Sequence, residues 1–274
     1  MRSKKAVELR VALAGYGAIG KRVASLLDQG IEGLRLVAVS ANNAARAEQH
    51  VATLRQPVPV LPLAQLAEVA DVVVECAPAH LLPEIATPVL RAGKVLVTVS
   101  VGALLKAPEL VDLAREHGGR IHVPSGALLG LDAVQAAALG EIYEVTMETR
   151  KPLRGLAGAP YVEGRQIDLS QVEEPLKLFE GSAAEAIEGF PANLNVAVAL
   201  GLAGVGPENT RLQVWADPSV DRNTHIINVR SDSADLHLVI RNIPTDENPK
   251  TGRITALSIV ATLRKMAVPL VIGT

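Results

Sequence analysis

The stretch Gly15-Tyr16-Gly17-Ala18-Ile19-Gly20 decides the fold of this chain. It follows an apolar run at residues 9–14 and precedes residues 21–27, whose pattern predicts a helix. A strand, a glycine turn and a helix in this order form the dinucleotide-binding fingerprint, and this context argues against a glycine turn without a ligand. The first glycine permits the tight turn, the second lets the backbone approach a pyrophosphate, and the third lets the helix pack closely on its strand. The free N–H groups at the helix start would then face the phosphate charge.

The composition of the chain limits its fold class. Its 274 residues are enough for two modest domains or one large one. Hydrophobic residues make up 49% of the sequence and the mean hydropathy is +0.26, so a sizeable core is available. Aromatic residues make up only 2%, so this core must consist of Ala, Val, Leu and Ile. Such a core suits buried parallel strands that are covered by helices.

Charge and cysteine content indicate the partners and the compartment. The net charge is −2, without the basic excess that would indicate binding to nucleic acid or to an anionic membrane. The single cysteine, Cys76, cannot form an intrachain disulfide, which fits a reducing compartment. Charges interrupt the N-terminal region where a signal peptide needs an apolar core, and no apolar run approaches the roughly 18 residues of a membrane span. We therefore expect a soluble, cytoplasmic protein.

Strands and helices alternate through the first half of the chain. The expected strands after the glycine turn are residues 34–40, 71–75, 94–100 and 120–123, and the expected helices are residues 44–54, 81–92 and 108–117. This alternation predicts βαβ units and one parallel sheet of the Rossmann type.

The pattern changes after about residue 124. Helical patterns occur at residues 131–139 and at 185–204, where the second is broken by Gly189-Phe190-Pro191. They alternate with strand patterns at 141–151, 210–216, 224–230 and 236–241, of which the last three are expected to be antiparallel. This mixture predicts a second, α+β domain at residues 125–244, separated from the first by a cleft. The last helical pattern, at residues 254–266, is expected to return to the first domain, which then comprises residues 1–124 and 245–274.

The predicted parallel sheet locates the cofactor residues. Ligands of such sheets bind at the carboxyl ends of the strands, where small residues permit close approach. We expect the cofactor to contact the glycine turn through Gly15, Gly17, Ala18, Ile19 and Gly20, and later strand ends through Ser40, Ala77, Pro78, Val101 and Gly102.

The end of the second strand bears on the choice between NAD and NADP. A carboxylate that binds the adenosine ribose usually stands about 20 residues beyond the glycines, and this chain has Ser40 there. A carboxylate would repel the 2′-phosphate of NADP, whereas Ser40 would not and Arg46 would attract it. We expect that NADP is accepted, alone or alongside NAD. The alternative for Arg46 is a solvated helix residue.

An unusually polar segment at residues 217–225 separates two of the expected strands. It ends at His225, whose imidazole, with an ordinary pKa of about 6.5, can take and give protons near neutrality. A histidine in an apolar setting is more often structural. The neighbours Asp221, Arg222 and Asn223 favour a catalytic role, because they can position substrate, water and the imidazole together.

These motifs together resemble the L-aspartate dehydrogenase family, and the similarity runs along nearly the whole chain. It rests on the glycine turn and on six further blocks: Pro124-Ser125-Gly126-Ala127 with Leu131-Asp132-Ala133, Thr149-Arg150-Lys151-Pro152, Phe190-Pro191-Ala192-Asn193-Leu194-Asn195-Val196-Ala197, Asp217-Pro218 through Asn223-Thr224-His225, Asn248-Pro249-Lys250-Thr251, and Gly273-Thr274.

The resemblance implies an activity and three site residues. The activity is the reversible, NAD(P)-dependent oxidation of L-aspartate to oxaloacetate and ammonia through iminoaspartate, with a link to NAD synthesis and a homodimeric assembly. The family's catalytic histidine falls on His225, and its cofactor-contacting alanine and asparagine fall on Ala127 and Asn195. No metal is expected. The two carboxylates of the substrate need donors, for which the candidates are Lys151, Arg150, Arg222 and Asn223.

Two alternatives stay open at this stage. The first is a different NAD(P)-dependent reductase on the same two-domain architecture, one that acts on a cyclic imine or on homoserine, because fold does not fix function. The second is a redox sensor that binds NADP without turnover.

Overall fold

The computed structural model describes residues 8–190, 194–245 and 251–273. The chain divides into two compact units. Unit 1 consists of Met1–Gly126 and Thr255–Ile272, and unit 2 consists of Ala127–Ile254 with Gly273–Thr274. The resemblance blocks at residues 191–193, 248–250 and 274 lie outside the described residues.

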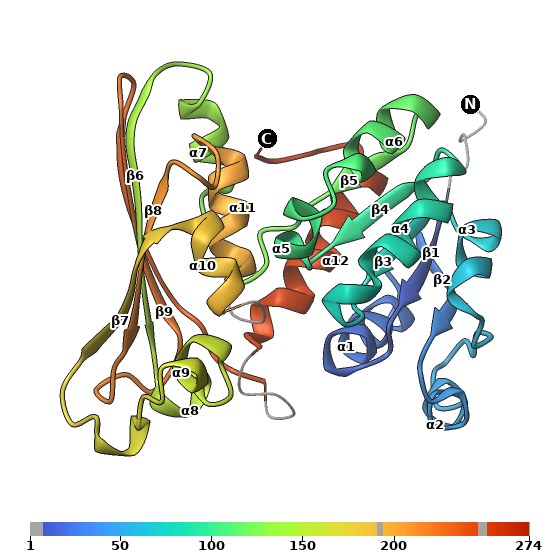
Figure 1. Ribbon diagram of the computed structural model, residues 1–274. Helices are drawn as coiled ribbons and strands as arrows, with labels where there is room; N and C mark the ends of the chain where they lie inside the picture. The colour runs from blue at the N-terminus through green and yellow to red at the C-terminus, as the bar shows by residue number, and fades with distance from the viewer. Residues whose placement is uncertain (1–7, 191–193, 246–250, 274) are drawn as a thin grey trace. The chain divides into compact units, whose positions relative to one another are not determined.

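Unit 1 contains the parallel sheet that the sequence predicts (Figure 1). Its strands lie in the order β2-β1-β3-β4-β5, and each pair of neighbours is parallel. The strands are β1 (Leu9–Ala14), β2 (Leu34–Ser40), β3 (Val72–Glu75), β4 (Val95–Thr98) and β5 (Arg120–His122). They consist mainly of Val, Leu and Ala, as expected for strands that are buried on both faces.

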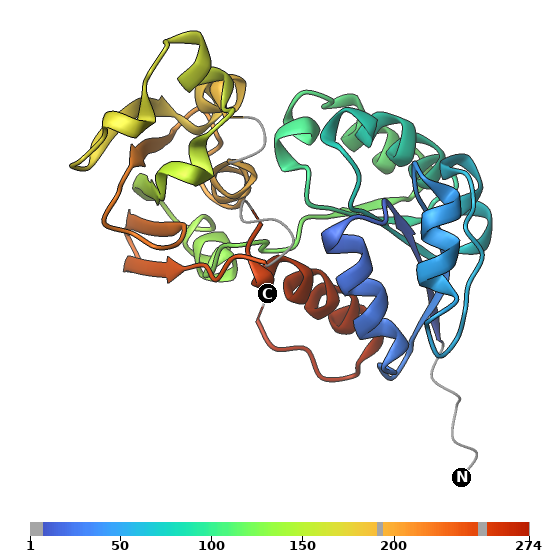
Figure 2. The same ribbon diagram turned by 90° about the horizontal axis from the view of Figure 1, so that it is seen from below.

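Helices cover both faces of this sheet (Figure 2). Val11 and Leu13 of β1 point to one face, whose core includes residues of α1 (Ala18–Asp28) and α2 (Ala44–Val51). Ala12 and Ala14 point to the other face, where the covering helices are α3 (Leu66–Val69), α4 (Leu82–Arg91), α5 (Val101–Leu105) and α6 (Glu109–His117). Two short 3-10 turns, Leu63–Gln65 and Ala79–Leu81, precede α3 and α4.

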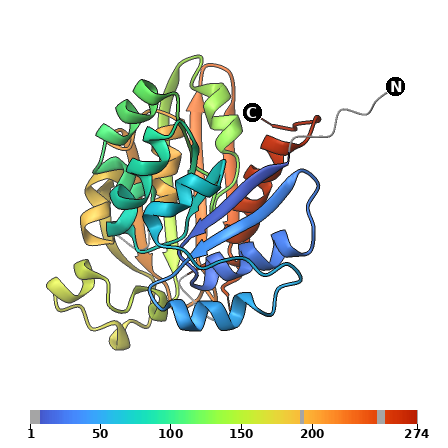
Figure 3. The same cartoon turned by 90° about the vertical axis from the view of Figure 1, so that its right-hand side faces the viewer.

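The last helix, α12 (Arg253–Ala267), belongs mostly to unit 1. Its residues Ala256, Ile259 and Leu263 are buried in the same core as Val11 and Leu13. In Figure 3 it lies behind the two blue strands β1 and β2. The expectation that the C-terminal helix returns to the first domain is therefore confirmed.

Unit 2 contains a mixed sheet in the order β10-β9-β6-β8-β7. The strands are β6 (Ile142–Lys151), β7 (Leu176–Ser182), β8 (Thr210–Ala216), β9 (Thr224–Ser231) and β10 (Asp235–Arg241). The sequence prediction was wrong for β8, which is antiparallel to β7 but parallel to β6. It also missed β7, because this edge strand is largely exposed and polar and therefore lacks an apolar alternation.

The helices α7 (Leu131–Ala137), α10 (Ala183–Gly189) and α11 (Asn195–Ala203) lie along one face of this sheet (Figure 1). The break expected near Gly189 and Phe190 within the helical region 185–204 is confirmed, because α10 ends at Gly189 and α11 begins at Asn195. Ser182 and Glu185 form a capping box at the start of α10. The segment between β6 and β7 forms α8 (Leu153–Leu156), α9 (Pro160–Gly164) and a 3-10 turn at Leu169–Gln171.

Candidate active site

Four neighbouring strands of unit 1, β2, β1, β3 and β4, end at paired residues. Ser40 of β2 pairs with Ala14 of β1, Ala14 with Glu75 of β3, and Glu75 with Thr98 of β4. The loops that follow these residues therefore start at the same edge of the sheet, which we call the carboxyl edge. The cofactor residues expected in unit 1 all lie there: Gly15, Gly17, Ala18, Ile19, Gly20, Ser40, Ala77, Pro78, Val101 and Gly102.

The glycine turn has the geometry that the fingerprint requires. Gly15 has a φ of +106°, and a Cβ on it would lie 2.6 Å from the carbonyl carbon of Cys76. A Cβ on Gly20 would lie 2.1 Å from the carbonyl oxygen of Gly15, so α1 packs directly on the turn. At Gly17, the N-cap of α1, no atom lies within 4 Å of the Cβ position, and the first turn of α1 carries no acidic residue. The backbone at Gly17, beside the free N–H groups at the start of α1, is therefore open to the close approach that a phosphate needs.

The end of β2 carries no carboxylate. Ser40 is buried, and its carbonyl oxygen accepts a hydrogen bond of 3.0 Å from the Gly15 backbone N–H. The Asn43 side chain caps α2 by accepting a hydrogen bond of 2.9 Å from the backbone N–H of Arg46. Arg46 itself is exposed. This loop therefore contains no group that would repel a 2′-phosphate.

The sequence analysis missed Glu75 at the carboxyl edge. Its side chain is 0% exposed, and burial raises the pKa of its carboxyl group. The carboxylate accepts hydrogen bonds from Ala77, Thr98 and Ser100. In the sequence Glu75 is only the last residue of a valine-rich strand. An acidic residue at the end of a strand that is expected to be buried could have indicated a special role, because Glu is rarely fully buried.

In unit 2, His225 lies at the start of β9, opposite Thr149 of β6. Its Nδ1 atom is 3.1 Å from the Thr149 hydroxyl oxygen, and the residue is only 2% exposed. Lys151 is two residues beyond Thr149, on the same face of β6, and is also 2% exposed. Burial, together with the positive charge of Lys151, lowers the pKa of His225 to about 3. The imidazole is therefore neutral at physiological pH.

Arg150 lies on the opposite face of the sheet, because side chains alternate along a strand. Its guanidinium donates a hydrogen bond of 2.8 Å to Asp217, forms an ion pair with Glu148 and lies 5.0 Å from the ring centre of Trp215. These bonds hold the start of the 217–223 loop. Of the candidate donors for the substrate carboxylates, Arg150 thus lies on the face of β6 opposite to Lys151 and is engaged by Asp217 and Glu148.

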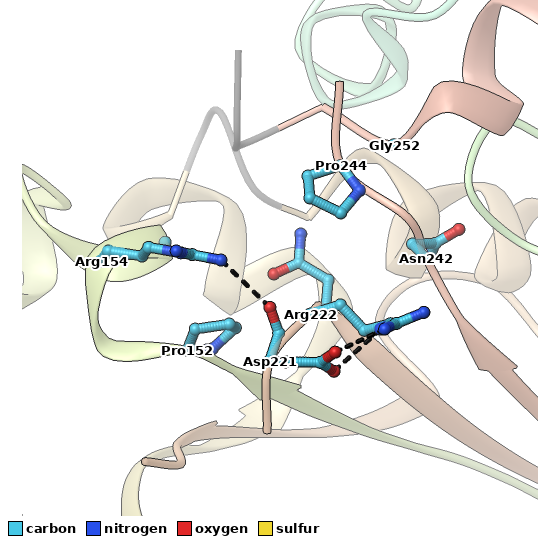
Figure 4. Close-up of a pocket in the computed structure, with 9 residues that line it drawn as sticks. Pro152, Arg154, Asp221, Arg222, Asn242, Pro244 and Gly252 are labelled. Atoms are coloured by element: carbon cyan, nitrogen blue, oxygen red, sulfur yellow. Dashed lines mark hydrogen bonds and ion pairs between the residues drawn. The ribbon is translucent and has the colours of Figure 1, made fainter. Parts of the chain in front are cut away.

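A small pocket in unit 2 brings together three loops (Figure 4). Arg154 and Gly155 come from the segment after β6, Arg222 and Asn223 precede β9, and Asn242 follows β10. A Cβ on Gly155 would lie 3.5 Å from the Asn223 side-chain oxygen and 4.0 Å from the Lys151 Cβ, so the pocket adjoins Lys151.

Arg222 is engaged within this loop. Its Nε atom donates a hydrogen bond of 2.8 Å to Asp221, and the pair lowers the pKa of the Asp221 carboxyl to about 2. Arg154 donates a hydrogen bond of 3.2 Å to the Asp221 backbone carbonyl (Figure 4).

Asn242 connects two of the expected site residues and was also missed. Its side-chain Nδ2 donates a hydrogen bond of 2.9 Å to the Ala127 carbonyl, and its backbone N–H donates one of 2.8 Å to the Asn223 carbonyl. Its Oδ1 atom is buried and makes no hydrogen bond with a residue that the structure describes. In the sequence, Asn242 only follows the strand expected at residues 236–241. Asn195, another expected cofactor contact, is the first residue of α11, for which Leu194 is the N-cap.

No helix among residues 8–190, 194–245 and 251–273 is long and apolar enough to cross a membrane. In the same part of the chain, no group of three or more His, Cys, Asp or Glu residues is arranged to hold a metal ion.

Comparison with known proteins identifies the family. The family model described as "Aspartate dehydrogenase, C-terminal" matches residues 132–266, and the one described as "Homoserine dehydrogenase, NAD binding domain" matches residues 15–124. L-aspartate dehydrogenase of Bradyrhizobium diazoefficiens is 58% identical over 97% of this chain and 95% of the relative. The chain belongs to the L-aspartate dehydrogenase family. L-aspartate dehydrogenase 3 of Bordetella bronchiseptica is 56% identical over 97% of this chain and 98% of its own length.

Solved structures agree with this family membership. The crystal structure of aspartate dehydrogenase from Thermotoga maritima superposes with a TM-score of 0.72 at 25% identity, covering 97% of this chain and 99% of that one. Biliverdin reductase from Synechocystis is 18% identical with a TM-score of 0.52, which shows a shared fold alone. The NAD-binding match and the glycine turn together show an NAD(P)-binding oxidoreductase.

Proposed function

We propose that this chain is an NAD(P)-dependent L-aspartate dehydrogenase in which His225 is the acid–base catalyst. The reaction is the reversible oxidation of L-aspartate to iminoaspartate, followed by hydrolysis to oxaloacetate and ammonia. One observation carries the proposal: a buried imidazole lies beside a buried lysine on one face of β6 and β9, next to the Asn223 loop.

The carboxyl edge of unit 1 is the proposed binding site for the dinucleotide. The glycine turn would hold the pyrophosphate, and the loops at Ala77–Pro78 and Val101–Gly102 would contact the rest of the cofactor, together with Ala127 and Asn195 of unit 2. The bound cofactor supplies the hydride acceptor, and the protein orients the substrate carbon toward it.

The neutral state of His225 suits it to act as a base. The substrate amine must be neutral for its lone pair to form the imine as hydride leaves, so a proton has to be removed. Burial and Lys151 keep the pKa of His225 low in the free protein. A bound substrate with two carboxylates offsets the charge of Lys151, the smaller of the two causes of the low pKa, and thereby raises the pKa of the imidazole. The same group can then activate the water that adds to the imine.

Thr149 fixes the imidazole for this role. Its hydroxyl lies 3.1 Å from Nδ1, and this hydrogen bond determines the ring orientation and leaves the Nε2 atom as the reacting nitrogen. Among the described residues, Nε2 makes no hydrogen bond.

The substrate carboxylates are assigned to Lys151, with Asn223 and Arg222 in supporting roles. Lys151 supplies a buried positive charge next to the imidazole, where a carboxylate would bind most strongly. Asn223 can donate from its amide near the same point, and Arg222 can release Asp221 to reach a carboxylate at the pocket.

Several finer features follow from the same proposal. The neutral end of β2 and Arg46 favour acceptance of NADP, alone or alongside NAD. The family resemblance supports a homodimer, a cytoplasmic location and a contribution of the imine intermediate to pyridine nucleotide synthesis. The charge of −2 argues against partners among nucleic acids and anionic membranes.

A spectrophotometric assay tests the function. The purified protein is given oxaloacetate and ammonia with NADH or NADPH, and in reverse L-aspartate with each oxidised cofactor. We expect reversible turnover with aspartate and none with homoserine. Turnover of homoserine or a cyclic imine in place of aspartate would show a different reductase, and cofactor binding without any turnover would show a redox sensor. The family match over residues 132–266 favours neither alternative.

A further inference from the structure

The carboxylate of Glu75 is bonded to both loops that follow β3 and β4. Its Oε1 atom accepts hydrogen bonds from the Ala77 backbone N–H at 2.9 Å and from the Ser100 hydroxyl at 3.2 Å. Its Oε2 atom accepts hydrogen bonds from the Thr98 hydroxyl at 2.7 Å and from the Ser100 backbone N–H at 3.2 Å. Each oxygen therefore accepts one backbone N–H and one hydroxyl, and neither loop can shift without breaking a bond to the carboxylate.

The glycine turn packs against the same group of atoms. A Cβ on Gly15 would lie 2.6 Å from the carbonyl carbon and oxygen of Cys76, and 2.7 Å from the Ala77 nitrogen. The peptide between Cys76 and Ala77 is thus held by Glu75 on one side and covers Gly15 on the other. Through this peptide, Glu75 determines the position of three segments: the glycine turn, the 76–78 loop and the start of α5.

The Ser100 side chain is hydrogen-bonded to Glu75 and does not cap its own helix. A serine at an N-cap position usually accepts a hydrogen bond from the first turn of the helix. Ser100 is the N-cap of α5 but makes no such bond, and its hydroxyl donates to Glu75 instead. The carboxylate therefore fixes how the chain enters Val101 and Gly102.

The carboxylate is costly to bury and is held by neutral donors. Glu75 is 0% exposed and forms no ion pair with a described residue. Apolar residues would stabilise such a position at least as well as a buried charge does. The useful property of a carboxylate here is that its two oxygens can accept four hydrogen bonds at once.

We propose that Glu75 is a positioning residue for the dinucleotide, which holds the peptide 76–77 and the start of α5 in the arrangement that accepts the cofactor. This inference rests on the proposed function only in assigning those loops to cofactor binding. Glu75 itself does not touch the cofactor and acts through Ala77 and Ser100.

The variant Glu75→Gln separates the hydrogen bonds from the size of the side chain. A glutamine has one oxygen and one NH2 group. In either orientation its NH2 faces one of the two backbone N–H donors, while the hydroxyls can rotate to accept from it. The Ala77 N–H is then left without an acceptor, or the Ser100 N–H keeps only its other hydrogen bond, of 3.1 Å to the Thr98 hydroxyl oxygen. We expect the dissociation constant of NADPH or NADH, measured by nucleotide fluorescence without any substrate, to rise about tenfold or more, as for a lost hydrogen bond to a charged group.

Hydrogen–deuterium exchange gives a second readout in the absence of cofactor. In Glu75→Gln, the peptide that contains the Ala77 amide or the one that contains the Ser100 amide should exchange faster than in the wild type, while peptides of β1 and α4 should not. The variant Ser100→Ala, which removes a single hydroxyl donor, should raise the dissociation constant by a smaller factor in the same direction. If Glu75→Gln folds poorly, Ser100→Ala can be used to test the proposal in its place.

Val74→Ala is the matched control. Val74 precedes Glu75 and is fully buried in the core on the α1 side of the sheet, so its truncation lowers stability without touching the two loops. Its dissociation constant for the dinucleotide should stay within about twofold of wild type. The proposal is overturned if Glu75→Gln binds the dinucleotide as the wild type does, or if Val74→Ala weakens binding equally. A wild type that binds dinucleotide but does not oxidise aspartate would refute the proposed function and leave this inference intact.

Discussion

Glu75 in unit 1 and His225 in unit 2 are both buried ionisable groups, one at the last residue of β3 and the other near the first residue of β9. They differ in how many of their hydrogen-bonding atoms have a partner. The Glu75 carboxylate accepts four hydrogen bonds from neutral donors. The His225 ring makes one among the described residues, to Thr149, and has a buried lysine nearby. A group whose bonds are all used can only hold its neighbours in place. A group with an unused nitrogen and a lowered pKa can exchange a proton with a ligand.

Removing the imidazole should have the largest effect. His225→Ala is expected to lower kcat by about a hundredfold or more, because it removes a general acid–base group. Dinucleotide affinity should change little, since His225 is not one of the proposed cofactor contacts. Steady-state kinetics with L-aspartate and nucleotide fluorescence measure the two quantities. Unchanged kcat would remove the role assigned to this residue.

Removing the neighbouring charge should have the next largest effect. Lys151→Met keeps the length of the side chain and deletes its positive charge, so the KM for L-aspartate should rise about tenfold to a hundredfold, as for a lost charged hydrogen bond. The control is Lys177→Met on the edge strand β7, where the side chain is 40% exposed and its loss should leave KM unchanged. If both variants bind aspartate normally, the carboxylates are bound elsewhere.

The lowered pKa of His225 also predicts a smaller effect, on stability against acid. The unfolded chain binds a proton on this histidine near pH 6.5, whereas the folded protein does so only near pH 3. Stability associated with His225 is therefore full above pH 6.5 and is lost as the pH falls toward 3, by up to about 1.4 kcal/mol per pH unit. His225→Gln should flatten the decline of the unfolding free energy between pH 6 and 4.5, measured by urea denaturation. Parallel curves for the two proteins would mean that His225 is not buried in a neutral form.

The same contrast explains what the sequence could predict. The parallel sheet and the glycine turn were predictable because local spacing determines both: Gly15 needs a positive φ, and the apolar runs have the length of buried strands. His225 stood out because it ends a polar segment between two strands.

Other parts of the site depend on contacts between residues far apart in the chain. Glu75 gains its role from Ser100, and Asn242 gains its role from Ala127, at separations that no local pattern records. Arg150 and Lys151 are adjacent in the sequence, and from the sequence alone either could bind a substrate carboxylate. Side chains alternate along β6, and the pairing with β9 shows which face carries His225. Lys151 lies on the same face as the imidazole and Arg150 on the other.

The most direct test of the account is an NMR titration of the His225 imidazole, assigned by comparison with His225→Gln, in the free protein and with the unreactive dicarboxylate succinate. We predict that the ring of the free protein stays neutral from pH 7.5 down to at least about pH 5, since its pKa is lowered to about 3, and that succinate raises its pKa. An imidazole that titrates near pH 6.5 in the free protein and does not respond to succinate would contradict the claim that burial and Lys151 prepare His225 to accept the substrate's proton.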